Sequence, residues 1–175
     1  MADPGRASRR LVLVRHAKSD WPEGVPDHDR PLSDRGRRDA GALGRWLRDT
    51  GLAPDLVVVS TARRARQTWE RAADAVGSPG EVRLDDRVYG ADEDDLLAVL
   101  RGTPAAVGTL VVVGHSPGTE RVALRLDDGT GYARDAARLR AKLPTTGVAV
   151  LDVGHDWGEV GPRSCRLVVV AAPRG

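Results

Sequence analysis

The sequence predicts an α/β domain of three layers, with helices on both faces of a mostly parallel central sheet. Short Val-rich runs alternate along the chain with longer stretches of helical composition, which is the pattern of strand–helix–strand units. The runs are continuously apolar, as expected for strands buried on both faces. Because 175 residues suffice for one domain with a substantial core, we expect a single domain over residues 1–175, with residues 1–8 as a flexible tail.

The first half of the chain contains two such strand–helix pairs. A strand is expected over residues 11–14, and the next helix begins at Ser33, whose side chain can cap it. That helix ends before Gly51, a residue typical of helix C-termini. Its apolar face consists of Ala40, Leu43, Trp46 and Leu47. The second strand is expected over residues 55–60 and the second helix over about 62–75.

The second half continues the alternation. A helix is expected over about 92–101, because acidic residues fill its first turn and apolar residues follow. A third strand covers 109–113, and the stretch 121–143 has helical composition but is interrupted by Gly129 and Gly131. The last two strands are expected over residues 148–151 and 167–170.

Composition excludes several classes of function. The net charge of +2 gives no strong attraction to nucleic acid or to a membrane surface. No apolar run approaches the ~20 residues that span a bilayer, and the N-terminus lacks the apolar stretch of a signal peptide. The single cysteine, Cys165, excludes an intrachain disulfide and a multi-cysteine zinc site, and we expect it to be buried. A cytoplasmic protein, monomeric by default, is the expectation.

Polar residues follow three of the predicted strands where each strand ends. Arg15 and His16 come after the first strand, Ser60 ends the second before an arginine-rich helix, and His115 follows the third. Parallel neighbouring strands would bring these residues to one sheet edge, where ligands bind in open α/β sheets. Histidines and arginines together form a cationic pocket that suits phosphate oxygens. A neutral imidazole can be the nucleophile, so the residues favour phosphoryl transfer through a histidine.

Four segments in this order resemble the motifs of the histidine phosphatase superfamily, the phosphoglycerate mutase-like group. They are Leu13–Ala17, Pro31–Gly36, Ser60–Thr68 and Val113–Ser116. The stretch Arg15–Ser19, followed by Trp21 and Asp29–Leu32, is similar to the SixA-type phosphohistidine phosphatases, which are compact and lack inserted lid segments. The resemblance extends from about residue 11 to about residue 126, and it implies a phosphoglycerate mutase-like fold.

The resemblance also implies roles for particular residues. His16 would be the nucleophile that becomes phosphorylated. Arg15, Arg64 and His115 would hold the phosphoryl group and its developing charge, and the backbone N–H of Ser116 would add a donor. Because side chains supply the positive charge, we expect neither a metal nor an organic cofactor.

Residues around this site have more open assignments. Lys18, Ser19 and Trp21 lie close to the nucleophile in the sequence and are candidates for the rim of the pocket. The general-acid glutamate of larger family members has no clear match, and Asp86 and Asp92 are the candidates nearest to its expected position. A phosphohistidine leaving group can be protonated near neutral pH, so a missing acid favours phosphohistidine over a sugar phosphate.

The long polar loop over residues 17–32 invites two interpretations. Long loops in compact domains are often functional. His28 lies between two aspartates, as a metal ligand could, but a solvent-exposed polar loop is the preferred interpretation. Asp29 and Arg30 would then brace the loop or narrow the mouth of the pocket.

Three functions remain open at this point. The first is a phosphatase acting on protein phosphohistidine. The second is a phosphatase of the same mechanism acting on a small phosphoester. The third is a non-catalytic phosphate-binding module that retains the arginines. A nucleic-acid binder is disfavoured, because the chain has few aromatic residues and no recognised nucleic-acid-binding motif.

Overall fold

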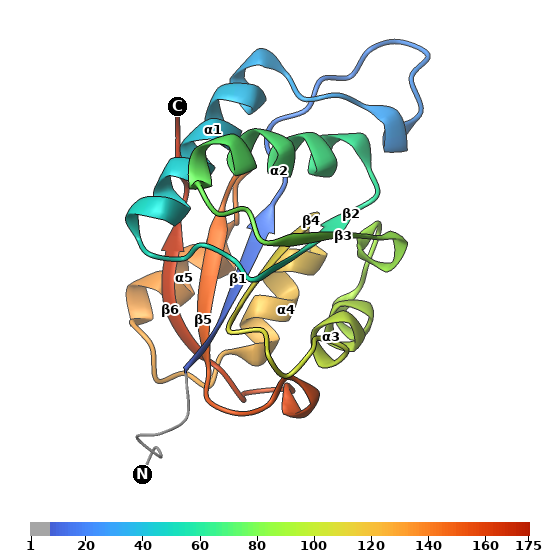
Figure 1. Ribbon diagram of the computed structural model, residues 1–175. Coiled ribbons are helices and arrows are strands. Elements are labelled where there is room, and N and C mark those ends of the chain that lie inside the picture. The colour runs from blue at the N-terminus through green and yellow to red at the C-terminus, as the bar shows by residue number, and fades with distance from the viewer. Residues whose placement is uncertain (1–7) are drawn as a thin grey trace.

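The computed structural model describes residues 8–175 and consists of a six-stranded sheet with helices on both faces (Figure 1). The strand order is β3-β2-β4-β1-β5-β6. The strands are β1 (Arg9–Arg15), β2 (Leu56–Ser60), β3 (Glu81–Asp85), β4 (Thr109–Gly114), β5 (Val148–Val153) and β6 (Arg166–Ala171). Strands β1 to β4 pair in parallel, whereas β5 is antiparallel to both β1 and β6. The predicted three-layer α/β class with a mostly parallel sheet is therefore confirmed.

Five α-helices and three short 3₁₀ helices connect the strands. The α-helices are α1 (Asp34–Asp49), α2 (Arg63–Val76), α3 (Glu93–Arg101), α4 (Gly118–Leu126) and α5 (Ala133–Ala141). The 3₁₀ helices are η1 (Asp27–Asp29), η2 (Asp86–Val88) and η3 (Trp157–Glu159). No helix within residues 8–175 is long and apolar enough to cross a membrane. The predicted N-terminal tail lies outside the described residues, except for Ser8.

The helix boundaries follow the local signals in the sequence. The Ser33 side chain accepts a hydrogen bond from the backbone of Gly36, as an N-cap does. Gly51, which has a φ of +71°, follows the end of α1 in the left-handed conformation that glycine adopts readily. The stretch 121–143 divides into α4 and α5, with Gly129 and Gly131 between them.

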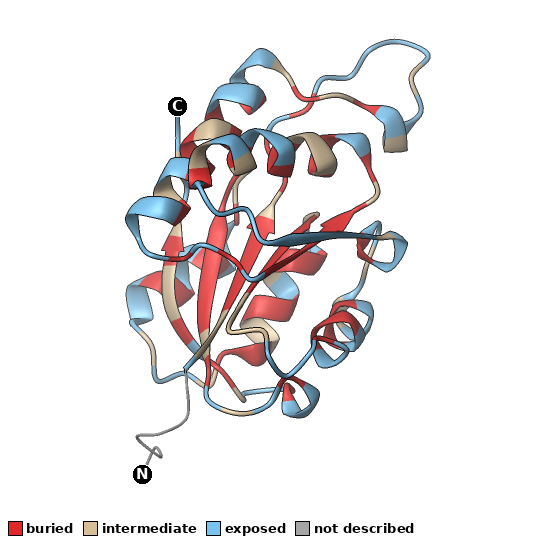
Figure 2. Cartoon of the chain, viewed as in Figure 1, coloured by how far each residue is buried: buried red, intermediate tan, exposed pale blue. Residues whose placement is uncertain are grey.

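Alternating side chains of the strands build one apolar layer on each face of the sheet. Val12 and Val14 pack with Leu43 of α1 and Trp69 of α2, so these two helices cover one face. Leu11 belongs to the other layer, which contains apolar residues of α3, α4 and α5. Strands β1, β2, β4 and β5 are correspondingly buried along most of their length, while the loop 17–32 is largely exposed (Figure 2). Cys165 is buried, as expected.

Strand β3 is the element that the sequence analysis missed. It alternates charged residues with Val82 and Leu84, which are 47% and 56% exposed. It pairs with β2 alone, as an edge strand. A continuous apolar run marks a strand buried on both faces, so the criterion that found the other five strands could not find an exposed edge.

The strand register brings three chain segments side by side at the C-terminal ends of the parallel strands. Arg15 at the end of β1 is paired with Gly114 at the end of β4. Val59, one residue before the end of β2, is paired with Val113 of β4. The residues that follow β1, β2 and β4 therefore emerge together, as the parallel arrangement predicted.

Candidate active site

His16 follows β1, and its two hydrogen-bond partners hold the ring in one tautomer. Its Nδ1 lies 2.7 Å from the carbonyl oxygen of Ala17, and its Nε2 lies 3.2 Å from Nε of Arg64. A carbonyl only accepts and a guanidinium only donates, so the proton is on Nδ1 and the lone pair is on Nε2. Burial is the main cause that lowers the pKa of His16 to about 3; the hydrogen bond to Ala17 opposes this effect, and the neighbouring histidine and arginines add to it. His16 is therefore neutral at pH 7, with Nε2 free to attack an electrophile.

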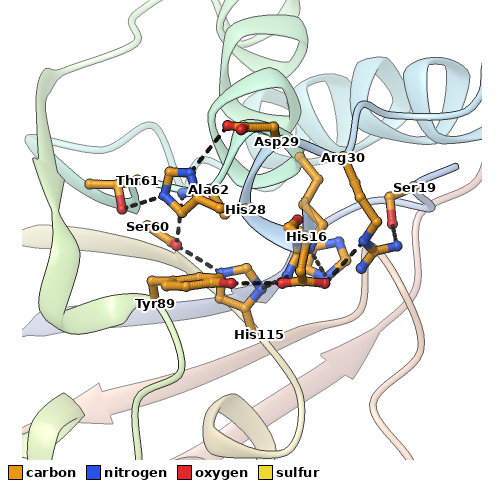
Figure 3. Close-up of polar contacts among 12 residues, drawn as sticks. His16, Ser19, His28, Asp29, Arg30, Ser60, Thr61, Ala62, Tyr89 and His115 are labelled. Carbon is orange, nitrogen blue, oxygen red and sulfur yellow. Dashed lines mark hydrogen bonds and ion pairs between the residues drawn. The ribbon is translucent and has the colours of Figure 1, made fainter. Parts of the chain in front are cut away.

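His115 follows β4 and lies beside His16, with 5.0 Å between the ring centroids (Figure 3). Its Nε2 lies 2.7 Å from Oγ of Ser60, and its Nδ1 lies 3.3 Å from Nη2 of Arg64. Arg64 donates to Nδ1, so the proton of a neutral ring is on Nε2 and is donated to Ser60. Burial and then Arg64 lower the pKa of His115 to about 4. Two neutral imidazoles therefore face the same guanidinium.

Arg64 lies in the first turn of α2 and is nearly fully buried. Besides its contacts with the two histidines, it donates from Nη1 to the backbone oxygen of Asp27 at 2.6 Å and from Nη2 to Oδ2 of Asp27 at 3.1 Å. Arg63, one residue before it, is exposed. The structure thus places Arg64, and not its exposed neighbour Arg63, between the two histidines.

Thr68 ties the loop after His16 to the helix that carries Arg64. Its hydroxyl accepts a hydrogen bond from the backbone N–H of Ala17 at 2.9 Å and donates to the carbonyl oxygen of Arg64 at 2.7 Å. Since Ala17 also holds the ring of His16, this buried hydroxyl fixes two site residues relative to each other. The sequence analysis gave Thr68 no role of its own.

Arg15 and Ser116 flank this group. Nη1 of Arg15 donates to the carbonyl oxygen of Leu143 at 2.8 Å, and its buried Nε has no hydrogen-bond partner among the described residues. Burial lowers the pKa of Arg15, and the Glu120 carboxylate opposes this effect. The hydroxyl of Ser116 donates to Oε1 of Glu120 at 2.6 Å. Arg15 therefore retains a buried donor without a partner among the described residues.

Asp27 and Tyr89 complete the site, and sequence reasoning missed both. Oδ2 of Asp27 accepts from the Tyr89 hydroxyl at 2.8 Å and from Arg64, while Oδ1 accepts from Nε of Arg30 at 3.0 Å. The Tyr89 hydrogen bond is the main cause that lowers the pKa of Asp27 to about 2, so the carboxylate is ionised. The ring of Tyr89 meets that of His115 edge-on, with centroids 5.6 Å apart. No periodic pattern marks either residue, because Asp27 begins the short 3₁₀ helix η1 and Tyr89 follows the short 3₁₀ helix η2.

The candidate rim residues divide into one group that braces the loop and one that does not. Buried Ser19 accepts a hydrogen bond from Nη1 of Arg30 at 2.9 Å. The guanidinium of Arg30 stacks on the Trp21 ring, 3.4 Å from its centroid. Trp21 itself is 74% exposed. Lys18 is exposed, and its carbonyl oxygen accepts from the backbone and hydroxyl of Ser33. Arg30 thus braces the loop, as one interpretation of the sequence expected.

Three further polar residues that the sequence singled out are His28, Asp92 and Asp86. His28 is half-buried: its Nε2 lies 3.0 Å from Oγ1 of Thr61 and its ring meets Tyr89 edge-on, so it docks the loop instead of facing only solvent. Asp92 caps α3 through hydrogen bonds from that helix's first turn. Asp86 is exposed. No group of three or more His, Cys, Asp or Glu side chains within residues 8–175 is placed to hold a metal ion.

The buried neutral histidines predict that the protein loses stability as the pH falls from 7 to 5. In the unfolded chain both rings have a pKa of about 6.5, whereas in the fold the values are about 3 for His16 and about 4 for His115. The unfolded state therefore binds protons that the folded state does not, which costs about 2 kcal/mol for each ring between pH 7 and pH 5. Asp27 acts in the same direction, but only below about pH 4, because its lowered pKa likewise leaves the unfolded state with more bound protons than the folded state.

Urea unfolding at pH 7 and at pH 5 measures this effect. Replacing His115 with Asn should reduce the pH dependence by about half. The corresponding change at His155, which lies outside the site, should leave the dependence as it is. A free energy of unfolding that is equal at the two pH values would contradict the buried, neutral state of the rings.

Comparisons with known proteins identify what the chain is similar to. A family model described as the histidine phosphatase superfamily, branch 1, matches residues 11–95. An uncharacterised protein of Mycobacterium tuberculosis is 43% identical over 162 residues, which cover 92% of this chain and all of that protein. Among solved structures, a protein of Nakamurella multipartitia, provisionally assigned as the phosphohistidine phosphatase SixA, is 35% identical. It has a TM-score of 0.85 and covers 98% of this chain and 99% of that chain.

A second solved structure is also similar to most of this chain. The protein of Agrobacterium tumefaciens, also provisionally assigned as the phosphohistidine phosphatase SixA, is 30% identical, with a TM-score of 0.79. The match covers 94% of this chain and 98% of that chain. Both matches extend over nearly the whole of the chain, whereas the family model ends at residue 95.

Proposed function

This chain belongs to the histidine phosphatase superfamily and to its SixA-type branch, and from that membership we propose that it removes phosphoryl groups from protein phosphohistidine through an intermediate on His16. One observation carries the catalytic part of the proposal. The neutral His16 ring keeps its proton on Nδ1, against Ala17, and directs the Nε2 lone pair towards the side of the ring where Arg64 lies. A buried nucleophile beside a guanidinium is what attack on a phosphoryl group requires.

In the first step, Nε2 of His16 attacks the phosphorus and the bond to the leaving group breaks. The phosphoryl oxygens replace His16 and His115 as acceptors for Arg64, and the unpartnered Nε of Arg15 supplies a further donor. The backbone N–H of Ser116, two residues after the end of β4, adds one more. His115 takes up a proton when the dianion arrives, since a nearby negative charge raises the pKa of an imidazole.

In the second step, water attacks the phosphorus and His16 leaves. The phosphorylated ring carries phosphorus on Nε2 and a proton on Nδ1, which remains bonded to Ala17. When the P–N bond breaks, its electron pair returns to Nε2 and the ring leaves as neutral imidazole. This step needs no general acid, because the leaving ring already carries its proton.

The same reasoning favours phosphohistidine as the substrate over a sugar phosphate. An alkoxide leaving group requires a proton donor, whereas imidazole does not. Neither acid considered for this role makes a side-chain hydrogen bond to the site residues within the described part of the chain: Asp92 caps α3, and Asp86 is exposed. The two solved relatives at 30% identity or more also carry the phosphohistidine phosphatase assignment.

The test compares phosphate release from three substrates in the presence of EDTA: a phosphohistidine peptide, a phosphoserine peptide and a sugar phosphate. We expect turnover of the phosphohistidine peptide to be fastest and to persist in EDTA, because arginine and histidine side chains supply the positive charge. Faster turnover of the sugar phosphate would establish a small-phosphoester phosphatase instead. Binding of the phosphopeptides without any turnover would identify a phosphate-binding module.

A further inference from the structure

The carboxylate of Asp27 lies at the mouth of the site and has no role in the two steps above. Its side chain is 48% exposed, whereas the side chains of its two arginine partners, Arg64 and Arg30, are 6% and 7% exposed. Arg64 spans the distance between this carboxylate and the nucleophile, with Nε on His16 and Nη2 on Asp27. A half-exposed anion therefore lies one guanidinium away from Nε2 of His16.

Asp27 is also held firmly in this place. Tyr89, Arg64 and Arg30 all donate to its carboxylate, and its backbone oxygen accepts from Arg64. His28, the next residue, is docked between Thr61 and Tyr89. Within residues 8–175, Oδ1 has a single protein donor, Arg30. The oxygen thus retains the capacity to accept a hydrogen bond from a group that enters the mouth.

The leaving group of the proposed substrate needs a hydrogen-bond acceptor of this kind. Phosphohistidine leaves as neutral imidazole only when its second ring nitrogen carries a proton; without that proton it must leave as an anion. An unperturbed imidazole titrates at about pH 6.5, so above neutral pH the proton is largely absent unless a partner stabilises it. A carboxylate bonded to a ring N–H favours the protonated ring.

We infer that Asp27 binds the second ring N–H of the substrate phosphohistidine and keeps the leaving imidazole protonated. This inference rests on the proposed function and names the feature of the substrate that the site selects. Asp27 thereby does for imidazole what a general acid does for an alkoxide, without transferring a proton. A phosphoester has no N–H on its leaving group, so Asp27 does not assist its departure.

The resulting transfer is balanced in charge and in bonds. The substrate begins with a protonated ring bound to phosphorus, and His16 begins as a neutral ring. The lone pair of Nε2 of His16 forms the new P–N bond, and the electrons of the old P–N bond return to the substrate ring. Each ring keeps its own proton throughout, one against the Ala17 carbonyl and one against the Asp27 carboxylate. No co-reactant is required.

Other acidic groups near the site are less suited to this role. Glu120 accepts a hydrogen bond from Ser116 and acts on Arg15, not on Arg64. The side chain of Asp29 is 60% exposed, and its Oδ1 lies 3.4 Å from Nδ1 of His28. Asp29 therefore serves as a matched control, since it carries the same charge on the same 3₁₀ helix but does not contact Arg64.

The experiment measures kcat/KM of the wild type, Asp27→Asn and Asp29→Asn on a phosphohistidine peptide and on p-nitrophenyl phosphate. The nitrophenolate group leaves without a proton, so it reports on the rest of the site. We divide kcat/KM for the phosphohistidine peptide by kcat/KM for p-nitrophenyl phosphate. For Asp27→Asn we expect this ratio to fall by about tenfold or more at pH 8. At pH 5.5 the free ring is protonated without help, and the ratio should recover to within about threefold of the wild type. Asp29→Asn should change the ratio by less than about twofold.

Several outcomes overturn the inference. If Asp27→Asn lowers activity on both substrates equally, Asp27 only positions Arg64. If it raises activity on both, the carboxylate competes with the phosphoryl group for Arg64. A ratio that falls by the same factor at both pH values would exclude protonation of the leaving ring as the cause. If the wild type hydrolyses p-nitrophenyl phosphate but not the phosphohistidine peptide, the proposed substrate itself fails.

Discussion

Asparagine in place of His16 should lower kcat on the phosphohistidine peptide by about 10⁴-fold or more. The amide nitrogen of asparagine is not a nucleophile, so the covalent route is lost and only direct attack by water remains. The fold should survive, because the side-chain amide is small and polar enough to keep a hydrogen bond near the Ala17 carbonyl or Arg64. Loss of a buried ring with a lowered pKa should also make the variant less sensitive to acid than the wild type.

Rapid quenching with a ³²P-labelled phosphohistidine peptide measures the intermediate directly. The wild type should retain label that is stable to base and released by acid, as expected of a phosphorus–nitrogen bond, and His16→Asn should retain none. His155→Asn is the matched control, because His155 bonds backbone oxygens in a distant turn. Equal labelling of wild type and His16→Asn would place the nucleophile elsewhere, and His115 would then be the residue to replace.

That His16, His115 and an arginine-rich helix start would lie together could be predicted from strand ends, whereas the choice of Arg64 among its arginine neighbours came from the family resemblance. Each of these segments follows a strand whose apolar run is visible in the sequence, and parallel pairing brings those ends together. The protonation state of His16 could not be predicted in this way. It depends on a contact with the carbonyl of the next residue and on burial, which appear only when the chain has folded.

Asp27 and Tyr89 could not be predicted for a related reason. Apolar residues do not recur at a regular spacing in residues 17–32, so the sequence does not indicate which acidic side chain of this loop points into the site. The meeting of Asp27 with Tyr89 joins residues 62 positions apart and depends on how η1 docks beside α2. The prediction that this loop is functional was therefore within reach of the sequence, but the choice of residue was not. Strand β3 was missed because an exposed edge strand lacks the continuous apolar run of a buried one.

Lysine in place of Arg64 should lower kcat/KM by about 10²- to 10³-fold, although the positive charge is kept. Arg64 donates from three nitrogens to His16, His115 and Asp27. An ammonium group offers its three donors from a single point and cannot span these positions, so it cannot hold two phosphoryl oxygens in the fork geometry of a guanidinium. Arg63→Lys, an exposed change one residue away, is the matched control and should leave kcat/KM within about twofold.

The same substitution separates the electrostatic part of Arg64's action from the geometric part. Its charge helps to lower the pKa of both histidines. A lysine that keeps the charge nearby should leave those pKa values low, whereas Arg64→Gln should let both rise, which histidine NMR titration would detect. If Arg64→Lys retained full activity, charge alone would suffice, and Arg15 with His115 would have to orient the phosphoryl group. If both variants lost activity but only Arg64→Gln shifted the titrations, the fork geometry of Arg64 would be the property that catalysis requires.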